Sequence, residues 1–306
     1  MIYFSCIVTC FNREDTIVRS LISILTQEYE FFEIIVVDDN SSDNSIKVIE
    51  SLKSDKIRII QHDVNLGQNA ALNTGVKSAK YDFLAFLDSD DFWLPKYLLE
   101  MAKVYNSNPE IGFVYCSINS KSSPLWTLEG ENKYADTLDQ GFLSSMISIT
   151  AKKECVLSIG LFDLKYRMCQ DDDFCFRLAK EFSFSVIKQR LAQIGGAANS
   201  MTRNREELSK GWIFLFENYK NDIIQYCGYK TYSKHMLMVA IQLAHSKNIL
   251  LSIKYYIKSI YFYFRKGPNY FQFEKSLFYK LTLTLLITLI NLKQIKKWFR
   301  KLYLMI

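Results

Sequence analysis

Two aspartates, Asp88 and Asp90, lie one residue apart directly after the apolar run Phe83–Leu87. Two carboxylates at this spacing, at the end of a strand, can face the same crevice and hold Mg²⁺ or Mn²⁺ through their oxygens. A cation held there can neutralise the charge that develops on a departing diphosphate. The alternative is that Asp90 or Asp91 caps the helix that follows. The position after an apolar run favours the metal site, and Asp91 is kept as a candidate cap.

A second acidic pair, Asp38 and Asp39, follows the apolar run Phe32–Val37. A carboxylate at such a strand end can accept hydrogen bonds from a ribose hydroxyl or a base N–H. The alternative is turn chemistry, because Asp, Asn and Ser dominate turns. We favour a binding role for Asp39, and turn chemistry that includes helix capping for residues 40–43.

Three consecutive aspartates at 171–173 begin a helical pattern. Acidic side chains at the start of a helix are favoured by its dipole, which is the alternative to a catalytic role for all three. Asp173 and Arg177 stand four residues apart, the spacing of an exposed ion pair on a helix. Asp171 comes first and can project toward the acidic strand ends as a general base.

These acidic residues need a scaffold that brings the strand ends together. The first third of the chain alternates apolar, β-rich runs with amphipathic helical patterns, which is typical of a parallel sheet with helices on both faces. Ligands bind at the carboxyl ends of the strands in such sheets, so Thr9, Phe11 and Asn12 join the candidates. The expected strands are Phe4–Phe11, Phe32–Val37, Ile57–Ile60, Phe83–Leu87, Ile111–Tyr115 and Met146–Thr150, and the expected helices are Thr16–Leu25, Ile46–Leu52, Ala70–Ala79, Lys96–Tyr105, one starting near Gln170, and helices from residue 206 onward.

The composition is that of a folded chain, with 306 residues, 49% hydrophobic and 23% charged. It excludes a disordered protein, a collagen and a disulfide-stapled miniprotein. The seven cysteines include no CxxC pair, and the three histidines show no metal-ligand spacing. We therefore expect a cytoplasmic setting, packing roles for Cys169 and Cys175, and a hard cation held by carboxylates. No apolar run reaches the ~20 residues of a membrane span, and the first residues lack a signal-peptide pattern.

Three common enzyme classes are disfavoured by missing motifs. The chain has no GxGxxG after its first strand, no GxxxxGK[ST] and no GxSxG. The missing motifs therefore argue against a dinucleotide oxidoreductase, a P-loop enzyme and a serine hydrolase.

The charge of the chain is unevenly distributed. Residues 230–306 contain 14 Lys and Arg and a single acid, whereas the rest contains 24 basic and 31 acidic residues, so the two parts carry +13 and −7. The apolar segment Leu281–Leu292 is short and is followed by five basic residues, as in helices that lie in a membrane interface. We expect contact with an anionic membrane surface. The alternative is that these helices pack on the catalytic domain or on a second subunit. The second case would make the protein a homodimer.

The order of five motifs resembles that of family 2 glycosyltransferases with the GT-A fold. The resemblance covers roughly residues 1–200 and implies a mixed, mainly parallel α/β sheet flanked by helices, with a helical extension at the C-terminus. The motifs are IVTCFNRE at 7–14, IIVVDDNSSD at 34–43, NLGQNAALNTGV at 65–76, FLDSDD at 86–91, and GLFD with QDDDFCFRL between 160 and 178.

The resemblance also implies roles for individual residues. Asp88 and Asp90 form the family's DXD motif, with Asp90 as the direct metal ligand and Asp88 nearer the ribose. Asp171 matches the catalytic base of inverting members, and Gly195-Gly196 resembles a loop that closes over the donor. The nucleotide sugar, most often a uridine one, would contact Thr9, Phe11, Asn12, Asp39, Asn73, Asp88 and Ser89.

Two departures from the family pattern concern the site. Leu72 stands where the family often has an arginine, and Gln170 stands where a glutamate often precedes the base. A neighbouring carboxylate would raise the pKa of Asp171, and a neutral amide would not. The chain also lacks the QxxRW motif and the membrane helices of processive synthases, so one sugar per encounter is expected.

The resulting expectation is an inverting, Mn²⁺- or Mg²⁺-dependent transfer of one hexose or N-acetylhexosamine from a UDP-sugar to a lipid-linked saccharide. Such an enzyme of polysaccharide or lipopolysaccharide assembly would lie on the cytoplasmic face of the cell membrane and bind no nucleic acid. Residues 1–205 would form the catalytic domain, with a nucleotide-binding half at 1–117 and an acceptor half at 118–205, and 206–306 the basic helical region. The alternatives are a catalytically silent nucleotide-sugar-binding subunit and a nucleotidyltransferase.

Overall fold

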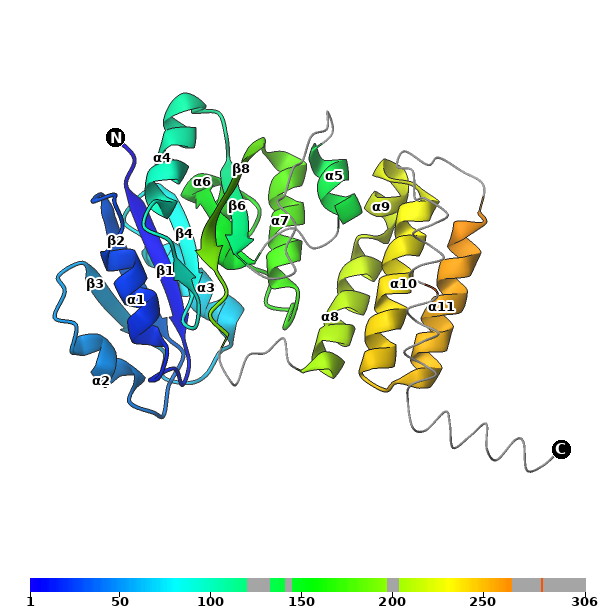
Figure 1. The fold of residues 1–306 in the computed structure, drawn as a ribbon, viewed down its shortest axis with the longest axis horizontal. Helices are drawn as coiled ribbons and strands as arrows, with labels where there is room; N and C mark the ends of the chain where they lie inside the picture. The colour runs from blue at the N-terminus through cyan, green and yellow to red at the C-terminus, as the bar shows by residue number, and fades with distance from the viewer. Residues whose placement is uncertain (120–132, 141–144, 197–203, 266–281, 283–306) are drawn as a thin grey trace. The chain divides into compact units, whose positions relative to one another are not determined.

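The computed structural model describes residues 1–119, 133–140, 145–196, 204–265 and 282 (Figure 1). The chain divides into two compact units. The first comprises Met1–Thr137 and Phe142–Ser200, and the second comprises Leu138–Gly141 and Met201–Ile306. The sequence places this boundary at residue 205, five residues further along.

The first unit is built on one mixed sheet of eight strands with the order β3-β2-β1-β4-β7-β6-β8-β5. The pairs β1–β2, β2–β3, β1–β4 and β6–β8 are parallel, and the pairs β4–β7, β6–β7 and β5–β8 are antiparallel. The expectation of a mixed, mainly parallel sheet is therefore confirmed. The strands are β1 (Phe4–Cys10), β2 (Phe32–Asp38), β3 (Ile57–Gln61), β4 (Phe83–Asp88), β5 (Phe92–Trp93), β6 (Phe113–Asn119), β7 (Ile149–Lys152) and β8 (Phe184–Gln193).

Helices cover both faces of this sheet, because side chains of each strand alternate between the faces. One face of β1, which carries Cys6 and Val8, packs against α1, α2 and α4 in a single apolar core. The other face carries Ile7, which lies against α3. The helices of this unit are α1 (Ile17–Leu25), α2 (Ser45–Glu50), α3 (Gln68–Ser78), α4 (Tyr97–Ser107), α5 (Lys133–Gln140, whose last residues belong to the second unit), α6 (Lys153–Ser158) and α7 (Gln170–Glu181).

Two close contacts fix α3 and α7 on the second face. A Cβ atom at Gly75 of α3 would lie 2.4 Å from the Cγ2 of Ile7, so only glycine lets the helix approach β1 this closely. The ring of Phe174 in α7 stacks on Phe162 at 4.2 Å, and both rings meet Phe86 of β4 edge-on. The first residues of both helices are thereby held near the end of β4.

The second unit consists of helices α8 (Arg205–Asn218), α9 (Lys220–Tyr226), α10 (Tyr229–His245) and α11 (Ile249–Tyr263). Figure 1 shows α10 and α11 side by side, and small residues let them approach: Ser233 Oγ donates to the carbonyl of Ser259 at 2.7 Å, and Ser252 Oγ donates to that of Ala240 at 2.8 Å. Among the helices that the structure describes, none is long and apolar enough to cross a membrane.

Several sequence expectations change in the structure. Met146–Ser148 is a 3-10 turn, and the strand expected from Met146 begins at Ile149. The strands β5 and β8 were not expected. All seven cysteines are free and buried, so the packing roles of Cys169 and Cys175 are confirmed. The segment Leu281–Leu292 and the basic residues after it lie outside the described residues, apart from Thr282.

Candidate active site

The carboxylates Asp88, Asp90 and Asp91 lie where β4 ends, in the middle of the sheet. Asp88 is the last residue of the strand and shares a face with Phe86, so its side chain lies on the side covered by α3 and α7. Thr9 stands beside Asp88 in the register of β1 and β4. Ser89 is buried behind this strand end. The structure thus brings Thr9, Asp88, Ser89 and Asp90 together at the carboxyl ends of β1 and β4, and these ends form the sheet edge of the candidate site.

Negative charge accumulates at this strand end. Burial raises the pKa of Asp88 well above its usual value, the charges of Asp91, Asp90 and Asp171 raise it further, and Arg13 opposes the shift. A carboxylate surrounded by like charges is stabilised by a cation, and oxygen ligands suit a hard divalent one. Asp88 and Asp90 are therefore the residues that would hold a Mg²⁺ or Mn²⁺ ion. Within the described ranges, no three His, Cys, Asp or Glu side chains form a complete protein-only metal site.

Asp91 does not cap the following helix, so the capping interpretation is wrong. The N-cap position of α4 is Lys96, and the short strand β5 separates the two. Asp91 Oδ1 instead accepts a hydrogen bond from the backbone N–H of Gly195 at 2.8 Å. Its burial raises the pKa to about 6, and the Gly195 N–H works in the opposite direction. Asp91 thus ties the loop after β8 to the acidic strand end.

Gly195 is placed where no other residue fits. A Cβ atom there would lie 2.0 Å from Arg19 Nη2 and 2.1 Å from the backbone oxygen of Asp90. We predict that Gly195→Ala displaces Asp90, costs about 1–3 kcal/mol of stability as overpacking does, and weakens metal-dependent nucleotide binding by about tenfold. Calorimetric unfolding and nucleotide titration with Mn²⁺ measure the two effects.

Gly160→Ala is the control for lost stability alone. Gly160 has a φ of +84° and open space around its Cα, so the substitution strains the backbone without touching the acidic strand end. If Gly195→Ala binds nucleotide no worse than Gly160→Ala, the loop does not position Asp90.

Asp39 is buried at the end of β2 and holds the loop that begins α3. Its carboxylate accepts hydrogen bonds from the N–H groups of Leu66 at 2.8 Å and Gly67 at 2.7 Å. His62 Nδ1 lies 2.7 Å from Asp39 Oδ1, and its Nε2 lies 2.9 Å from the hydroxyl of Thr74. His62 is therefore a partly buried bridge between Asp39 and Thr74. The contact between Asp39 and the nucleotide stays a prediction. The hydrogen bonds above already fix the orientation of its carboxylate.

The loop after β1 places Phe11 and Asn12 at the same sheet edge. Asn12 adopts a φ of 52°, donates its N–H to Ser41 Oγ at 2.9 Å and accepts the Ser42 N–H at 2.8 Å. Asn12 thus joins the loops after β1 and β2. Phe11 is exposed, so its ring is available for stacking on a base.

Asn73 positions the loop before α7, and its predicted contact with the donor stays a prediction. Its amide donates to the carbonyl of Phe162 at 2.9 Å and accepts the Phe162 N–H at 2.9 Å. Asn69, one turn earlier, donates to the carbonyls of Asp163 and Tyr166, both at 2.8 Å. Both amides are thus used to position the loop before α7.

Asp171 lies in the first turn of α7, and its charge reaches Asp88. Burial raises its pKa to about 6, although its own N–H and that of Asp172 favour the charged form. A carboxylate with this pKa is ionised at neutral pH and can still accept a proton, as a general base must.

The expected pair between Asp173 and Arg177 forms, but it is only partly exposed. Arg177 donates twice to Asp173 Oδ2, at 2.9 and 2.7 Å, and the exposed fractions of the side chains are 6% for Asp173 and 22% for Arg177. Arg177 also donates to the carbonyls of Ile159 and Leu161. The pair therefore anchors the loop before α7 to the helix.

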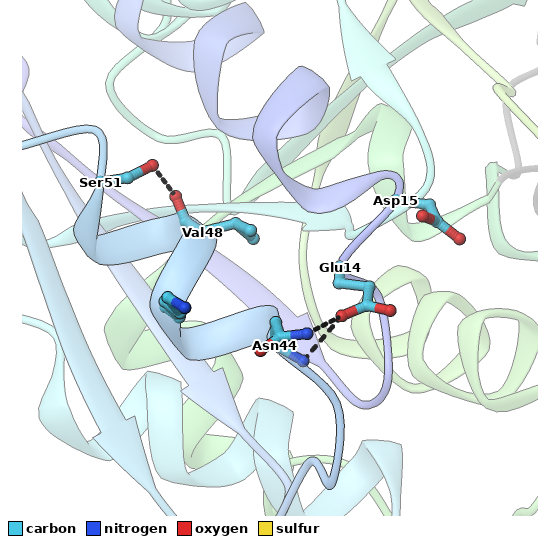
Figure 2. Close-up of a pocket in the computed structure, with 6 residues that line it drawn as sticks. Glu14, Asp15, Asn44, Val48 and Ser51 are labelled. Atoms are coloured by element: carbon cyan, nitrogen blue, oxygen red, sulfur yellow. Dashed lines mark hydrogen bonds between the residues drawn. The ribbon is translucent and has the colours of Figure 1, made fainter.

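A surface depression of about 440 Å³ lies elsewhere, between the loop after β1 and helix α2 (Figure 2). Glu14 accepts two hydrogen bonds from Asn44 there, both at 2.8 Å, as Figure 2 shows. Asp15, Lys47 and Ser51 complete the wall. None of the expected site residues lines it, so it has no part in the chemistry considered below.

Comparison with known families places this sheet edge in a known class of enzymes. The family described as "Glycosyl transferase family 2" matches residues 5–153, which include Thr9, Asp39, Asp88 and Asp90 but neither Asp171 nor Gly195. Residues 5–153 belong to glycosyl transferase family 2. The chain is a glycosyltransferase with the GT-A fold expected from its sequence.

Three bacterial relatives are similar over different shares of their length. An uncharacterised glycosyltransferase from Haemophilus influenzae is 31% identical over 60% of this chain and 64% of its own, just under two thirds. The amylovoran biosynthesis glycosyltransferase AmsB from Erwinia amylovora is 27% identical over 92% of this chain and 97% of its own. The UDP-Glc:alpha-D-GlcNAc-diphosphoundecaprenol beta-1,3-glucosyltransferase WfaP from Escherichia coli is 28% identical over 54% and 76%.

Two solved structures share the fold of this glycosyltransferase. TarS 1–349 of S. aureus in complex with UDP-GlcNAc aligns with a TM-score of 0.61 at 16% identity, over 86% of this chain and 89% of TarS. The mannosyltransferase PcManGT from Pyrobaculum calidifontis, in complex with GDP-Man and Mn²⁺, aligns with a TM-score of 0.62 at 14% identity, over 95% and 87%. At these identities the likeness concerns the fold.

Proposed function

We propose that this glycosyltransferase transfers a single hexose or N-acetylhexosamine from a UDP-sugar to a hydroxyl of a lipid-linked saccharide, with inversion. The observation that carries the proposal is the proximity of two kinds of carboxylate. Asp171, in the first turn of α7, lies close enough to Asp88 at the end of β4 for its charge to raise the pKa of Asp88. The proposed base, Asp171, thus lies beside carboxylates that could hold a cation for the diphosphate of the donor.

In the proposed reaction, Asp171 accepts the proton of the acceptor hydroxyl as that oxygen attacks the anomeric carbon. The bond to the diphosphate breaks as the new glycosidic bond forms, so a single displacement inverts the configuration. A divalent cation held by Asp90 and Asp88 would stabilise the negative charge on the leaving diphosphate. Buried aspartates hold the loops around this site in place. Asp39 accepts hydrogen bonds from Leu66 and Gly67, and Asp91 accepts one from Gly195.

The name of one relative supports the choice of donor and acceptor, and that of another supports the biosynthetic setting. The name of WfaP specifies a UDP-linked glucose donor and a diphosphoundecaprenol-linked acceptor, and that of AmsB specifies biosynthesis of the polysaccharide amylovoran. TarS has been solved with UDP-GlcNAc and PcManGT with Mn²⁺. We therefore propose polysaccharide or lipopolysaccharide assembly as the setting.

The transfer is tested by incubating the full chain with UDP-hexoses and UDP-N-acetylhexosamines, Mn²⁺ and diphosphoprenol-linked saccharides. Mass spectrometry should find one sugar added per acceptor, and the coupling constant of the new anomeric proton should report inversion. Donor binding without any transfer would support the silent-subunit alternative, and release of pyrophosphate from a nucleotide would support a nucleotidyltransferase.

We also propose that the second unit contacts an anionic membrane surface on the cytoplasmic side. Along one side of α11, Leu250, Ile257 and Phe264 are 85%, 61% and 75% exposed, and Ile253 and Tyr261 continue the stripe. At 100° per residue these five side chains share one sector of the helix, next to the exposed Lys254. An apolar stripe beside a basic margin is the pattern of a helix that lies in the membrane interface.

Ile257→Glu with Phe264→Glu tests this contact. Removing two apolar anchors and adding two negative charges should lower the bound fraction in cosedimentation with phosphatidylglycerol vesicles at least tenfold. Ile22→Glu, at an exposed apolar position of α1, is the matched control and should stay bound. Undiminished sedimentation of the double variant would exclude α11 as the contact.

A further inference from the structure

Three side chains from three different elements form a line of hydrogen bonds at the site. Gln170, the first residue of α7, donates from Nε2 to Gln68 Oε1 at 3.1 Å. Gln68, the first residue of α3, donates from Nε2 to Asp88 Oδ1 at 2.8 Å. All three side chains are partly buried. The line therefore joins the carboxylate at the end of β4 to the residue before the base Asp171.

The direction of these hydrogen bonds has a chemical consequence. A carboxylate that holds a cation is ionised and only accepts, so with the proposed metal on Asp88 the Gln68 side chain must turn its NH₂ group toward Asp88 and its oxygen toward residue 170, as it does in the structure. Residue 170 must then be a donor, which the amide of Gln170 is and a glutamate carboxylate is not. A carboxylate at position 170 would attract the NH₂ of Gln68 and leave its oxygen facing Asp88.

We infer that Gln170 sets the orientation of the Gln68 amide, and that Gln68 thereby acts as a positioning residue for the metal-binding carboxylate Asp88. The hydrogen bond to Asp88 is charge-assisted and holds Oδ1 in one direction. This inference rests on the proposed metal-binding role of Asp88. It gives a physical reason why this chain carries Gln170 at a position where the family resemblance implies a glutamate.

Two substitutions of Gln170 separate orientation from packing. Glutamate has nearly the shape of glutamine but cannot donate when ionised, whereas leucine removes the donor without adding an acceptor. If residue 170 orients Gln68, Gln170→Glu is the more harmful of the two. If residue 170 only fills space, Gln170→Leu is the more harmful, because the isosteric change preserves the packing.

The experiment titrates Mn²⁺ into the full chain with UDP at pH 8, followed by the electron paramagnetic resonance of free Mn²⁺. Losing a hydrogen bond to a charged group and placing an oxygen against it should raise the apparent Kd about tenfold or more in Gln170→Glu, against about threefold in Gln170→Leu. In a Gln68→Met background, Gln170→Glu should have no further effect, because the residue that transmits it is gone. Melting temperatures report any general loss of folding.

The outcomes separate this inference from the proposed function. If the wild-type chain binds no Mn²⁺ with UDP, the proposed metal site fails. If the wild-type chain binds and Gln170→Glu binds as well as or better than Gln170→Leu, the orienting role of Gln170 is overturned while the metal site stands. An additive effect of the two substitutions in the double variant would also overturn it.

Discussion

Asp171→Asn should lower kcat for glycosyl transfer by about 10²–10⁴-fold, the usual contribution of a general base. Asparagine keeps the size of the side chain and its place in the first turn of α7, but it cannot accept the proton of the acceptor hydroxyl. Donor binding should change little, since the proposed donor contacts come from the strand ends. Steady-state kinetics with a UDP-sugar and a lipid-linked saccharide measure the effect.

Asp172→Asn is the matched control for this prediction. Asp172 is buried one residue further along, and its pKa is raised well above the usual range by burial and by the charges of Asp171 and Asp173. An amide replaces this carboxyl with little change in shape. If both variants lose activity equally, the helix start as a whole is needed and Asp171 is not singled out as the base.

The pH dependence of the same reaction follows from the pKa of Asp171, about 6. The ionised form is the active base, so kcat should be constant above this pKa and fall about tenfold per unit below it. A carboxyl whose pKa is raised by folding stabilises the folded state at low pH and loses that contribution as the pH rises through the raised value. Protonation of Asp171 thus removes activity without unfolding the chain. A rate that stays constant down to pH 4.5 would exclude Asp171 as the base.

Asp90→Ala should lower kcat by about 10³-fold, corresponding to about 4 kcal/mol of lost transition-state stabilisation. The proposed leaving group is a diphosphate, which carries negative charge. The described residues at this end of the strands that could bind a cation to offset this charge are carboxylates. Loss of the one assigned as the direct ligand should also weaken UDP binding in the presence of Mn²⁺. Turnover and nucleotide titration give independent readings.

Asp82→Ala is the control for Asp90→Ala. Asp82 is exposed just before the start of the same strand, β4, so its removal changes the charge of the chain equally without touching the site. An Asp90→Ala enzyme with near-wild-type turnover would remove metal assistance through this residue from the account.

The central strands could be predicted from sequence because their patterns are simple. β1, β2 and β4 are buried on both faces and appear as continuous apolar runs that end in polar residues. β8 was missed because it mixes Lys188, Gln189 and Arg190 with apolar residues and is exposed in its middle, and β5 because it has two residues. Edge and bulged strands carry no regular hydrophobic period for a sequence pattern to detect.

The charged members of the site could be predicted, and its amide network could not. Aspartates directly after apolar runs or at a helix start are visible in the sequence, so Asp39, Asp88, Asp90 and Asp171 could be singled out as candidates. Gln68 begins α3 as many polar residues begin helices, and nothing in its spacing indicates a bond to Asp88. Its partners lie 20 and 102 residues away, so only the folded chain shows the line that they form.

The helix-capping interpretation of Asp91 failed, and the pair of Asp173 and Arg177 formed but is less exposed than expected, for a related reason. The sequence presents Asp91 near a helix start and Asp173 four residues before Arg177, which are local patterns with local explanations. In the fold, Asp91 bonds to Gly195 and Arg177 bonds to carbonyl groups of a preceding loop. A tertiary partner replaced the local one at Asp91, and tertiary partners joined the local one at Arg177, because buried polar groups need hydrogen bonds.

The most direct test of the nucleotide site is a thermal-shift panel of UDP, GDP, CDP and TDP, each with Mn²⁺ and with EDTA. A ligand that binds only the folded state at 100 times its Kd stabilises it by about 2.7 kcal/mol. The account predicts a higher Tm with UDP and Mn²⁺, no shift with UDP in EDTA, and loss of the shift in Asp90→Ala. Equal shifts with and without metal, or no shift with any diphosphate, would contradict it.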